Sequence, residues 1–265
     1  MSTPTAPSRP LGVVTGASSG IGRALVDEFV GAGFDLIAVS DEDMTDDIAR
    51  SGLGEHVRPL TADLATPSGN DDVVAAMVAD RRPVSAAVLN AGVGVHGRFD
   101  RADLADHLRV VGVNVVSPVR LAHHLLSGMV ARGEGRLMVT SSIAADGPGP
   151  FQSTYAASKA FLTSFAQALR YEMRGAGVTV TSLEPGPTDT RFFARARMEE
   201  TWLARGPKAD PATVAREGFA AMMAGKRRVV SGSKILKVQS IVTRRLPGAV
   251  SARFQAPLAK PRGDR

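Results

Sequence analysis

Residues 11–22 read LGVVTGASSGIG, a short apolar run followed at once by a turn with three glycines. The apolar run predicts a buried strand over Leu11–Thr15, and the residues after the turn predict a helix over Ile21–Ala32. Glycine permits a sharp turn and the close approach of a ligand, and the first N–H groups of a helix attract a pyrophosphate. A plain tight turn is the alternative, which the strand–turn–helix context disfavours. The candidate cofactor contacts here are Gly16, Ser18, Ser19, Gly20, Ile21 and Gly22.

The same alternation of apolar run, turn and helical pattern continues along the chain. Further strands are predicted over Asp35–Ser40, Val57–Thr61, Ala86–Asn90, Arg136–Ser141, Val178–Leu183 and Arg228–Ser231. Further helices are predicted over Asp71–Asp80, Leu104–Ala131, Tyr155–Arg174 and Pro211–Ala224. This order predicts an α/β fold, a doubly wound parallel sheet of the Rossmann type with about seven strands and helices on both faces. Pro59 lies in the third strand, which is an edge strand in the order 3-2-1-4-5-6, where proline is tolerated.

The composition excludes several classes of protein. With 265 residues, 44% of them hydrophobic, the chain can bury one sizeable core. It has no cysteine, which excludes disulfides, thiolate zinc sites and cysteine nucleophiles, and its five histidines show no metal-ligand spacing, so we expect no metal. No apolar run reaches the roughly 18 residues of a membrane span, and residues 1–10 lack a signal-peptide pattern, so we expect a cytoplasmic protein.

The net charge of +6 is concentrated at the C-terminal end. Residues 226–265 carry eleven Lys or Arg and one Asp, a net +10, which leaves −4 for the rest of the chain. We therefore expect a catalytic domain over residues 1–231, with no nucleic-acid partner, and a basic extension over residues 232–265. A helical stripe in this extension could lie on an anionic membrane, but packing on the protein's own core or on a partner subunit is favoured. The stripe consists of Ile235, Val238, Ile241, Val242 and Leu246.

Tyr155 and Lys159 stand four residues apart in a predicted helix, so both lie on one face. A lysine cation near a phenol favours the phenolate and lowers its pKa from about 10 toward the working pH. Such a tyrosine can give a proton to a substrate oxygen or take one from it. An ordinary surface pair is the alternative, because this spacing alone is a weak signal.

Several further motifs occur in a fixed order, with thirteen residues from Ser142 to Tyr155. They are residues 15–22, Asp63-Leu64, Asn90-Ala91-Gly92, Asn114, Ser141-Ser142, Tyr155 to Lys159, and Pro185-Gly186-Pro187-Thr188-Asp189-Thr190. On these motifs the chain from Leu11 to about Ser231 resembles a single-domain short-chain dehydrogenase/reductase. One departure is Ala145, where the family usually has glycine. The resemblance implies hydride transfer between a nicotinamide cofactor and a carbonyl or secondary alcohol.

The resemblance also implies a role for each matching residue. Ser142 would polarise the substrate carbonyl, Tyr155 would act as the acid/base, and Lys159 would lower the tyrosine pKa and hold the nicotinamide ribose. Asn114 would position a proton-relay water. The implied cofactor contacts are Asp63 and Leu64 at the adenine, Asn90, Ala91 and Gly92 at the adenosine side, and Pro185, Gly186, Thr188 and Thr190 at the nicotinamide end. Purely structural roles remain the alternatives, for example a helix N-cap for Thr190.

The segment Ser40-Asp41-Glu42-Asp43 follows the second predicted strand, where the adenosine ribose binds in such folds. A carboxylate there accepts a hydrogen bond from a free 2′-hydroxyl and repels a 2′-phosphate. Ser40 and Asp41 therefore predict NAD rather than NADP as the cofactor. Arg23, the cation nearest to the glycine turn in sequence, is expected to face solvent.

In the family the variable substrate lid follows the sixth strand, which places it here at Arg191 to about Pro207. Its apolar residues and the Pro148–Gln152 loop predict a hydrophobic small-molecule substrate, unless the aromatics only pack the lid itself. These lid residues are Phe192, Phe193, Met198 and Trp202. We also expect a homo-oligomer, a dimer or tetramer. A dinucleotide-binding interaction or sensor protein that has lost turnover is the alternative function.

Overall fold

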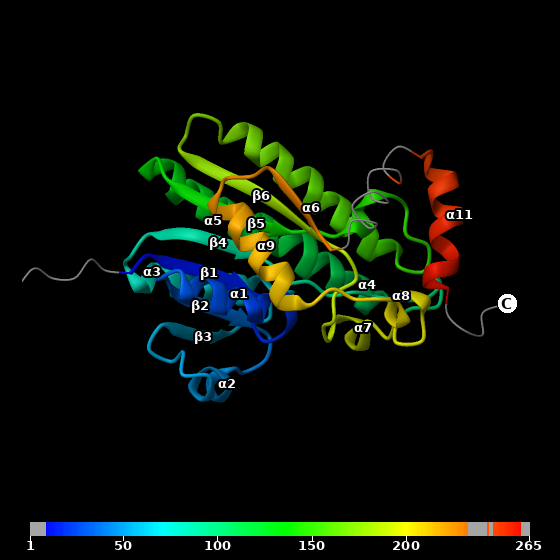
Figure 1. The fold of residues 1–265 in the computed structure, drawn as a ribbon, viewed down its shortest axis with the longest axis horizontal. Coiled ribbons are helices and arrows are strands. Elements are labelled where there is room, and N and C mark those ends of the chain that lie inside the picture. Colours follow the sequence, from blue (N-terminus) through cyan, green and yellow to red (C-terminus); the bar gives the residue numbers. More distant parts are fainter. Residues whose placement is uncertain (1–8, 233–242, 244–245, 261–265) are drawn as a thin grey trace, which may run out of the picture.

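The computed structural model describes residues 9–232, 243 and 246–260. Seven parallel strands form one sheet in the order β3-β2-β1-β4-β5-β6-β7 (Figure 1). They are β1 (Leu11–Thr15), β2 (Asp35–Ser40), β3 (Val57–Thr61), β4 (Val84–Leu89), β5 (Gly135–Thr140), β6 (Val178–Pro185) and β7 (Arg228–Ser231). The predicted doubly wound sheet is confirmed. Pro59 lies on the edge strand β3, which pairs with β2 alone, so the missing N–H of proline breaks no ladder.

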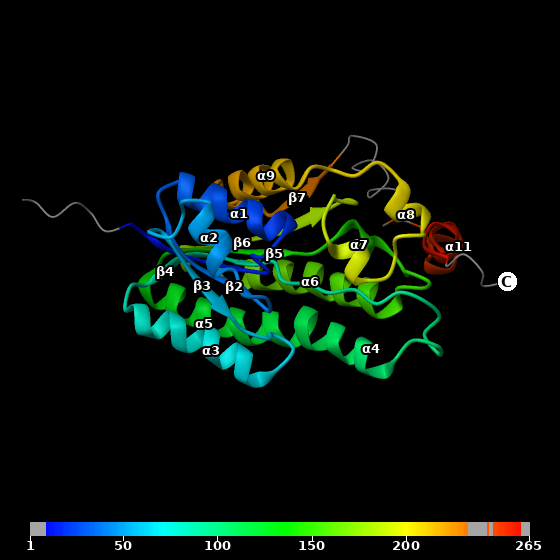
Figure 2. The ribbon, with the colours of Figure 1, turned by 90° about the horizontal axis from the view of Figure 1, so that it is seen from below.

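Helices cover both faces of the sheet (Figure 2). On one face α1 (Gly20–Gly31) and α9 (Pro211–Met223) bury apolar side chains such as Phe29 and Met222. On the other face α3 (Pro67–Asp80), α5 (Ser117–Arg132) and α6 (Ser153–Glu172) bury Leu121 and Leu162 among others. Every residue of β1 is buried, because a strand covered on both faces has no side facing water.

The helix predicted over Leu104–Ala131 is interrupted in the structure. It consists of α4 (Leu104–Val111), a π-helical turn η1 (Gly112–Val116) and α5. A π-helical turn holds one residue more than an α-helical turn, which changes the direction of the side chains in it. Here the turn includes Asn114, which is fully buried and hydrogen-bonded to Val93. Apolar periodicity in the sequence cannot reveal such an insertion.

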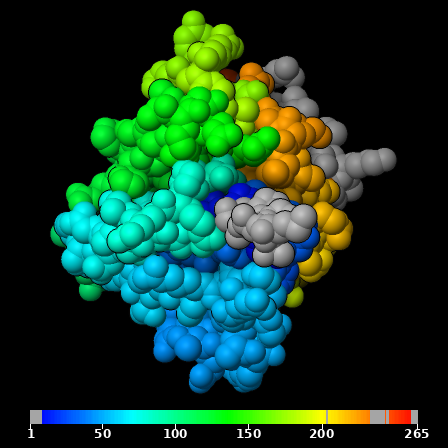
Figure 3. Space-filling model, turned by 90° about the vertical axis from the view of Figure 1, so that its left-hand side faces the viewer, coloured from blue at the N-terminus to red at the C-terminus, as the bar shows by residue number. Residues whose placement is uncertain are grey.

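The remaining helices are short or lie at the C-terminal end. They are α2 (Thr45–Arg50), the 3₁₀ turn η2 (Ile143–Asp146), α7 (Phe192–Arg195), α8 (Trp202–Arg205) and α11 (Gly248–Ala259). In Figure 1, α11 is drawn in red beyond the carboxyl ends of the strands, beside α8. The opposite end of the molecule, where the strands begin, faces the viewer in Figure 3.

The stripe predicted over residues 235–246 falls mostly outside the described residues, so its packing stays a prediction. Among the helices that the structure describes, none combines the length and apolar character that crossing a membrane requires.

Candidate active site

One pocket opens at the carboxyl ends of the strands and collects nearly all the residues singled out from the sequence. Of the four predicted catalytic residues, Ser142, Tyr155 and Lys159 line it, whereas Asn114 does not. All the predicted cofactor contacts line it as well: Gly16, Ser18, Ser19, Gly20, Ile21, Gly22, Ser40, Asp41, Asp63, Leu64, Asn90, Ala91, Gly92, Pro185, Gly186, Thr188 and Thr190.

The glycine turn forms a cradle without side chains between β1 and α1. Gly16 has φ +69°, a left-handed conformation that glycine adopts without strain. A Cβ on Gly22 would lie 1.9 Å from the carbonyl oxygen of Gly16, so no other residue fits there. Asn90 ties the turn to β4, because its Nδ2 donates to the carbonyl of Thr15 at 3.1 Å. The cradle at the start of α1 fits the pyrophosphate of a dinucleotide.

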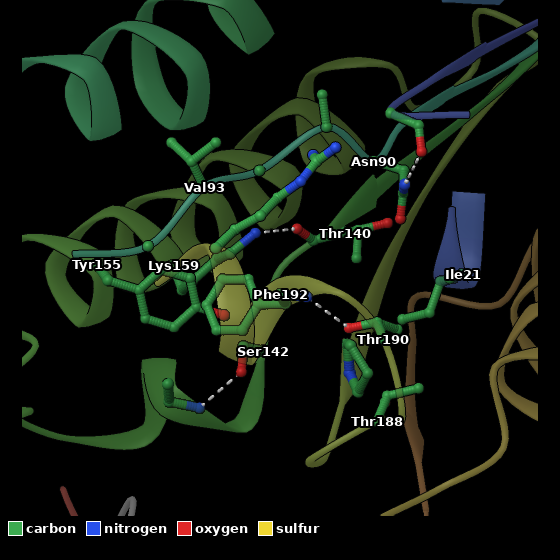
Figure 4. Close-up of a pocket in the computed structure, with 18 of the residues that line it drawn as sticks. Ile21, Asn90, Val93, Thr140, Ser142, Tyr155, Lys159, Thr188, Thr190 and Phe192 are labelled. Carbon is green, nitrogen blue, oxygen red and sulfur yellow. Dashed lines mark hydrogen bonds between the residues drawn. The ribbon is translucent and has the colours of Figure 1, made fainter. Parts of the chain in front are cut away.

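Ser142, Tyr155 and Lys159 lie together at the other end of the pocket (Figure 4). Ser142 follows β5, and its Oγ accepts a hydrogen bond from the N–H of Ala144 at 3.1 Å. Tyr155 and Lys159 come from the first turns of α6, with the lysine Nζ 5.7 Å from the centre of the tyrosine ring. The lysine Nζ also donates to the carbonyl of Thr140 at 2.9 Å, which holds the ammonium beside the phenol.

Burial sets the proton affinities of both groups. Tyr155 opens onto the pocket but is enclosed enough that burial raises its pKa to about 12, and a hydrogen bond with Ser142 offsets part of this rise. Burial lowers the pKa of Lys159 to about 8. Burial is the larger influence on the Tyr155 pKa, so the lowering expected from Lys159 is not seen in this structure. At neutral pH Tyr155 holds its proton and can donate it.

Asn114 lies behind the pocket wall and is fully buried. Its Oδ1 accepts from the N–H of Val93 at 3.0 Å, and its Nδ2 donates to the carbonyl of Val93 at 2.9 Å and to Ser158 Oγ at 3.0 Å. The amide thus braces the loop after β4 against α6. These contacts give Asn114 a bracing role, and the expectation that it positions a proton-relay water stays a prediction.

An arginine–carboxylate cluster surrounds the segment predicted to select the cofactor. Asp41 lies 3.5 Å from Arg109 of α4 and 3.9 Å from Arg195 of α7. Glu42 pairs with Arg195 and with Arg191, the latter at 3.1 Å. Three arginines therefore lie at this segment, although the sequence around it is acidic. No sequence signal places these arginines, since α4 and the lid are far from β2 along the chain.

The cluster extends to the predicted adenine contact, Asp63. Arg109 donates to its Oδ2 at 3.0 Å, and this hydrogen bond keeps the pKa of Asp63 below its usual value. Arg23, by contrast, pairs with Asp27 at 2.7 Å on the exposed side of α1 and does not line the pocket, as expected.

The predicted substrate lid contributes Phe192, Phe193 and Met198 to the pocket wall. The ring of Phe192 lies beside that of Tyr155 (Figure 4), with 5.0 Å between the ring centroids. Phe193 and Met198 are buried mainly in a small core of the lid itself, and Trp202 is 68% exposed and outside the pocket. Packing within the lid thus accounts for part of the aromatic and apolar set, and the hydrophobic substrate stays a prediction.

Two further wall residues, Gln255 and Leu258, come from α11 and escaped prediction. The helix has Pro257 in its interior and lies in the basic extension of residues 232–265, which shows no clear helical pattern of apolar residues there. Neither its formation nor its position over the pocket can be inferred from the sequence. No group of His, Asp and Glu among the described residues could hold a metal ion.

Comparison with known proteins assigns the family. The chain belongs to the short chain dehydrogenase family, whose model matches residues 12–201. A short chain dehydrogenase of Pseudocercospora fijiensis is 32% identical over 189 residues, which cover 69% of this chain and 60% of that protein. This chain therefore spans about three fifths of the length of that relative.

Solved structures share the fold over nearly the whole chain. A short-chain dehydrogenase from Sphingobium yanoikuyae in complex with NADPH has a TM-score of 0.78 at 24% identity, covering 97% of this chain and 98% of its own. A short chain dehydrogenase/reductase from Burkholderia phymatum in complex with NAD has a TM-score of 0.77 at 22% identity. The match covers 96% of this chain and 98% of that one.

Proposed function

We propose that this protein is a nicotinamide-dependent oxidoreductase that transfers a hydride between the cofactor and a carbonyl or secondary alcohol. The observation that carries the proposal is the convergence of Ser142, Tyr155 and Lys159 at one end of a pocket whose other end is a glycine cradle. A dinucleotide whose pyrophosphate lies in the cradle would therefore extend toward a proton donor (Tyr155), a hydroxyl (Ser142) and a cation (Lys159). The bound nicotinamide supplies the hydride, and the protein supplies the proton.

Each side chain has a role that its geometry supports. Tyr155, protonated at neutral pH, donates its proton to the substrate oxygen as that oxygen gains negative charge. Ser142 orients the same oxygen through its hydroxyl. Lys159 stabilises the phenolate that remains, and it lies within reach of the cofactor ribose beside Gly92. The polar contacts of Thr188 and Thr190 with their own loop shape the nicotinamide end.

We assign this chemistry to residues 1–231, with the lid at residues 191–207, and we treat residues 232–265 as an extension of that domain. The experiment that tests the proposal is a screen of ketones and secondary alcohols in which the absorbance of the reduced cofactor is followed with NADH and with NADPH. Turnover of any compound in the panel supports the enzyme. Cofactor binding without turnover throughout a broad panel supports a sensor or interaction protein.

We propose NAD(H) as the preferred cofactor, although the solved relatives include complexes with NADPH and with NAD. The support is Asp41, whose carboxylate lies in the pocket wall at the end of β2. The nearby Arg109, Arg191 and Arg195 are all engaged with carboxylates. A 2′-phosphate would lie beside the Asp41 carboxylate and compete with it for these arginines, whereas a 2′-hydroxyl would leave the ion pairs intact.

Asp41→Arg is expected to shift the ratio of kcat/KM for NADH over NADPH toward NADPH by about tenfold to hundredfold, the value of a charged hydrogen bond. The ratio is measured with one substrate in the wild type and in the variant. Asp46→Arg is the matched control. It makes the same change of charge, but Asp46 is exposed on α2 and does not line the pocket. A wild-type preference for NADPH of about tenfold or more would contradict the assignment.

We also propose that the chain forms a homo-oligomer. The support is a set of exposed apolar side chains on α4 and α5, since extended apolar patches on a soluble surface mark interaction sites. They are Leu104, Leu108, Val111, Val119 and Val130. Light scattering coupled to gel filtration is expected to give a dimer or tetramer mass, and a monomer at micromolar concentration would contradict this proposal.

A further inference from the structure

Three segments that are distant in sequence enclose the pocket beyond Tyr155. They are the loop after β4, the loop of residues 147–152 before α6, and α11. The N–H of Gly97 donates to the carbonyl of Phe151 at 2.8 Å, and His96 Nε2 donates to the carbonyl of Ala259 at 2.6 Å. These bonds tie both α11 and the 147–152 loop to the loop after β4.

Gln152 is presented to this part of the pocket by a strained turn. Phe151 before it has φ +63°, a conformation that is costly for a bulky side chain and is found chiefly where function requires it. Gln152 is only 7% exposed and lines the pocket. It occupies the N-cap position of α6, yet its side chain caps no N–H of the helix. Its amide forms no hydrogen bond with any residue that the structure describes and is not completely enclosed, so it can bond a molecule in the pocket.

A second amide lines the same pocket from α11. Gln255 lines the pocket, and its Nε2 donates to Ser251 Oγ one turn earlier at 3.0 Å. The side chains of Ser251 and Gln255 rest on Gly147, where a Cβ would lie 2.3 Å from Ser251 Oγ and 2.9 Å from Gln255 Nε2. The bond to Ser251 leaves the carbonyl oxygen of this amide available as an acceptor.

The other walls nearby are apolar, and they include Val93, Ile143, Phe192 and Leu258. The charged side chains described in this part of the pocket are Lys159, which is bonded to Thr140, and the buried carboxylate of Asp146. The site therefore combines apolar surface with amide groups that can donate and accept. Such a surface matches a neutral molecule with one polar group in an otherwise apolar frame.

We propose that Gln152 and Gln255 hydrogen-bond a second oxygen of the substrate, remote from the reacting carbonyl. The substrate class is then an apolar ketone or secondary alcohol that carries a second neutral oxygen group, such as a hydroxyl. This inference rests on the proposed function. It adds that the C-terminal helix α11 determines substrate specificity together with the turn before Tyr155.

The test uses pairs of neutral ketones that share one cyclic skeleton, with and without a hydroxyl on the side remote from the carbonyl. For each pair kcat/KM is measured in the full-length wild type and in the Gln152→Met and Gln255→Met variants. Gln167→Met is the matched control, because Gln167 is exposed on the same helix as Gln152. A pocket built to bond a hydroxyl rejects the analogue without it, so the wild type is expected to favour the hydroxylated ketone by about tenfold or more.

Each pocket variant is expected to lose about tenfold to hundredfold in kcat/KM for the hydroxylated ketone and to keep its kcat/KM for the plain ketone within about threefold. Gln167→Met should leave the ratio unchanged. Equal use of the two ketones by the wild type, or an equal loss for both in a variant, overturns the inference and leaves the proposed function standing. If no ketone of any pair is reduced, the proposed function fails and this inference fails with it.

Discussion

Replacing Tyr155 with phenylalanine is expected to lower kcat by about 10²–10⁴-fold, the contribution of a positioned acid/base. The variant removes only the phenol oxygen, so the ring still packs against Phe192 and the pocket keeps its shape. The dissociation constant of the cofactor is expected to change by less than about threefold, since one neutral hydroxyl contributes little to the affinity for a dinucleotide.

Turnover with a substrate from the screen and cofactor affinity by fluorescence titration measure the two effects separately. The chain offers a matched control in its other tyrosine, Tyr171, which is 66% exposed and contacts Arg174 far from the pocket. Tyr171→Phe is expected to keep full activity. Near-normal turnover in Tyr155→Phe would show that another group transfers the proton.

Lys159→Met is expected to impair both catalysis and cofactor binding. The ammonium is held beside the phenol by the carbonyl of Thr140 and stands next to Gly92, where the cofactor ribose is proposed to bind. Loss of a fixed charge that stabilises a developing anion costs about 10²–10³-fold in kcat. The dissociation constant of the cofactor should rise in the same variant. Unchanged cofactor affinity would contradict the double role of this lysine.

The same variant is expected to be more stable than the wild type at pH 7. The folded pKa of Lys159 is about 8 against a usual value of 10.5, so the folded protein holds a poorly solvated cation below pH 8. This corresponds to a cost of roughly 3 kcal/mol, which the loss of the hydrogen bond to Thr140 partly offsets in the variant.

The cost falls as the pH rises from 8 toward 10.5, because the unfolded chain then binds more protons than the folded one. Urea unfolding at pH 7 and pH 9.5 is expected to show the advantage of Lys159→Met shrinking at the higher pH. A variant less stable than the wild type at pH 7 would show that Lys159 is well solvated or well paired. Increased stability together with lost activity would also show that the loss is not caused by unfolding.

Most of the sheet could be predicted because its signals are local. Four of the seven strands, including β1 and β3, have the predicted bounds, and the other three differ by one or two residues at one or both ends. Apolar runs between turns predict buried parallel strands directly, and the position of Pro59 agrees with an edge. The glycine turn could be predicted for the same reason, since its strand, its glycines and its helix are contiguous.

What escaped prediction depends on contacts between distant segments. The π-helical turn that orients Asn114 leaves no mark on the apolar pattern of residues 104–131. The ion pair of Arg195 with Glu42 joins the lid to the end of β2, and no pattern in the sequence predicts that these two residues meet. The pKa of Tyr155 is set by how far the assembled pocket excludes water. A one-dimensional motif gives the identity of these groups, whereas their charge state and partners depend on the folded molecule.

The central claim is tested most directly by following the hydride itself. The enzyme is incubated with NADH or NADPH carrying deuterium at both C4 positions, together with the ketone panel, and the alcohol products are analysed by mass spectrometry. The account predicts an alcohol with one deuterium on the carbinol carbon, formed by the wild type and by Tyr171→Phe and nearly absent with Tyr155→Phe. Tight binding of both cofactors without labelled alcohol from any ketone would contradict it.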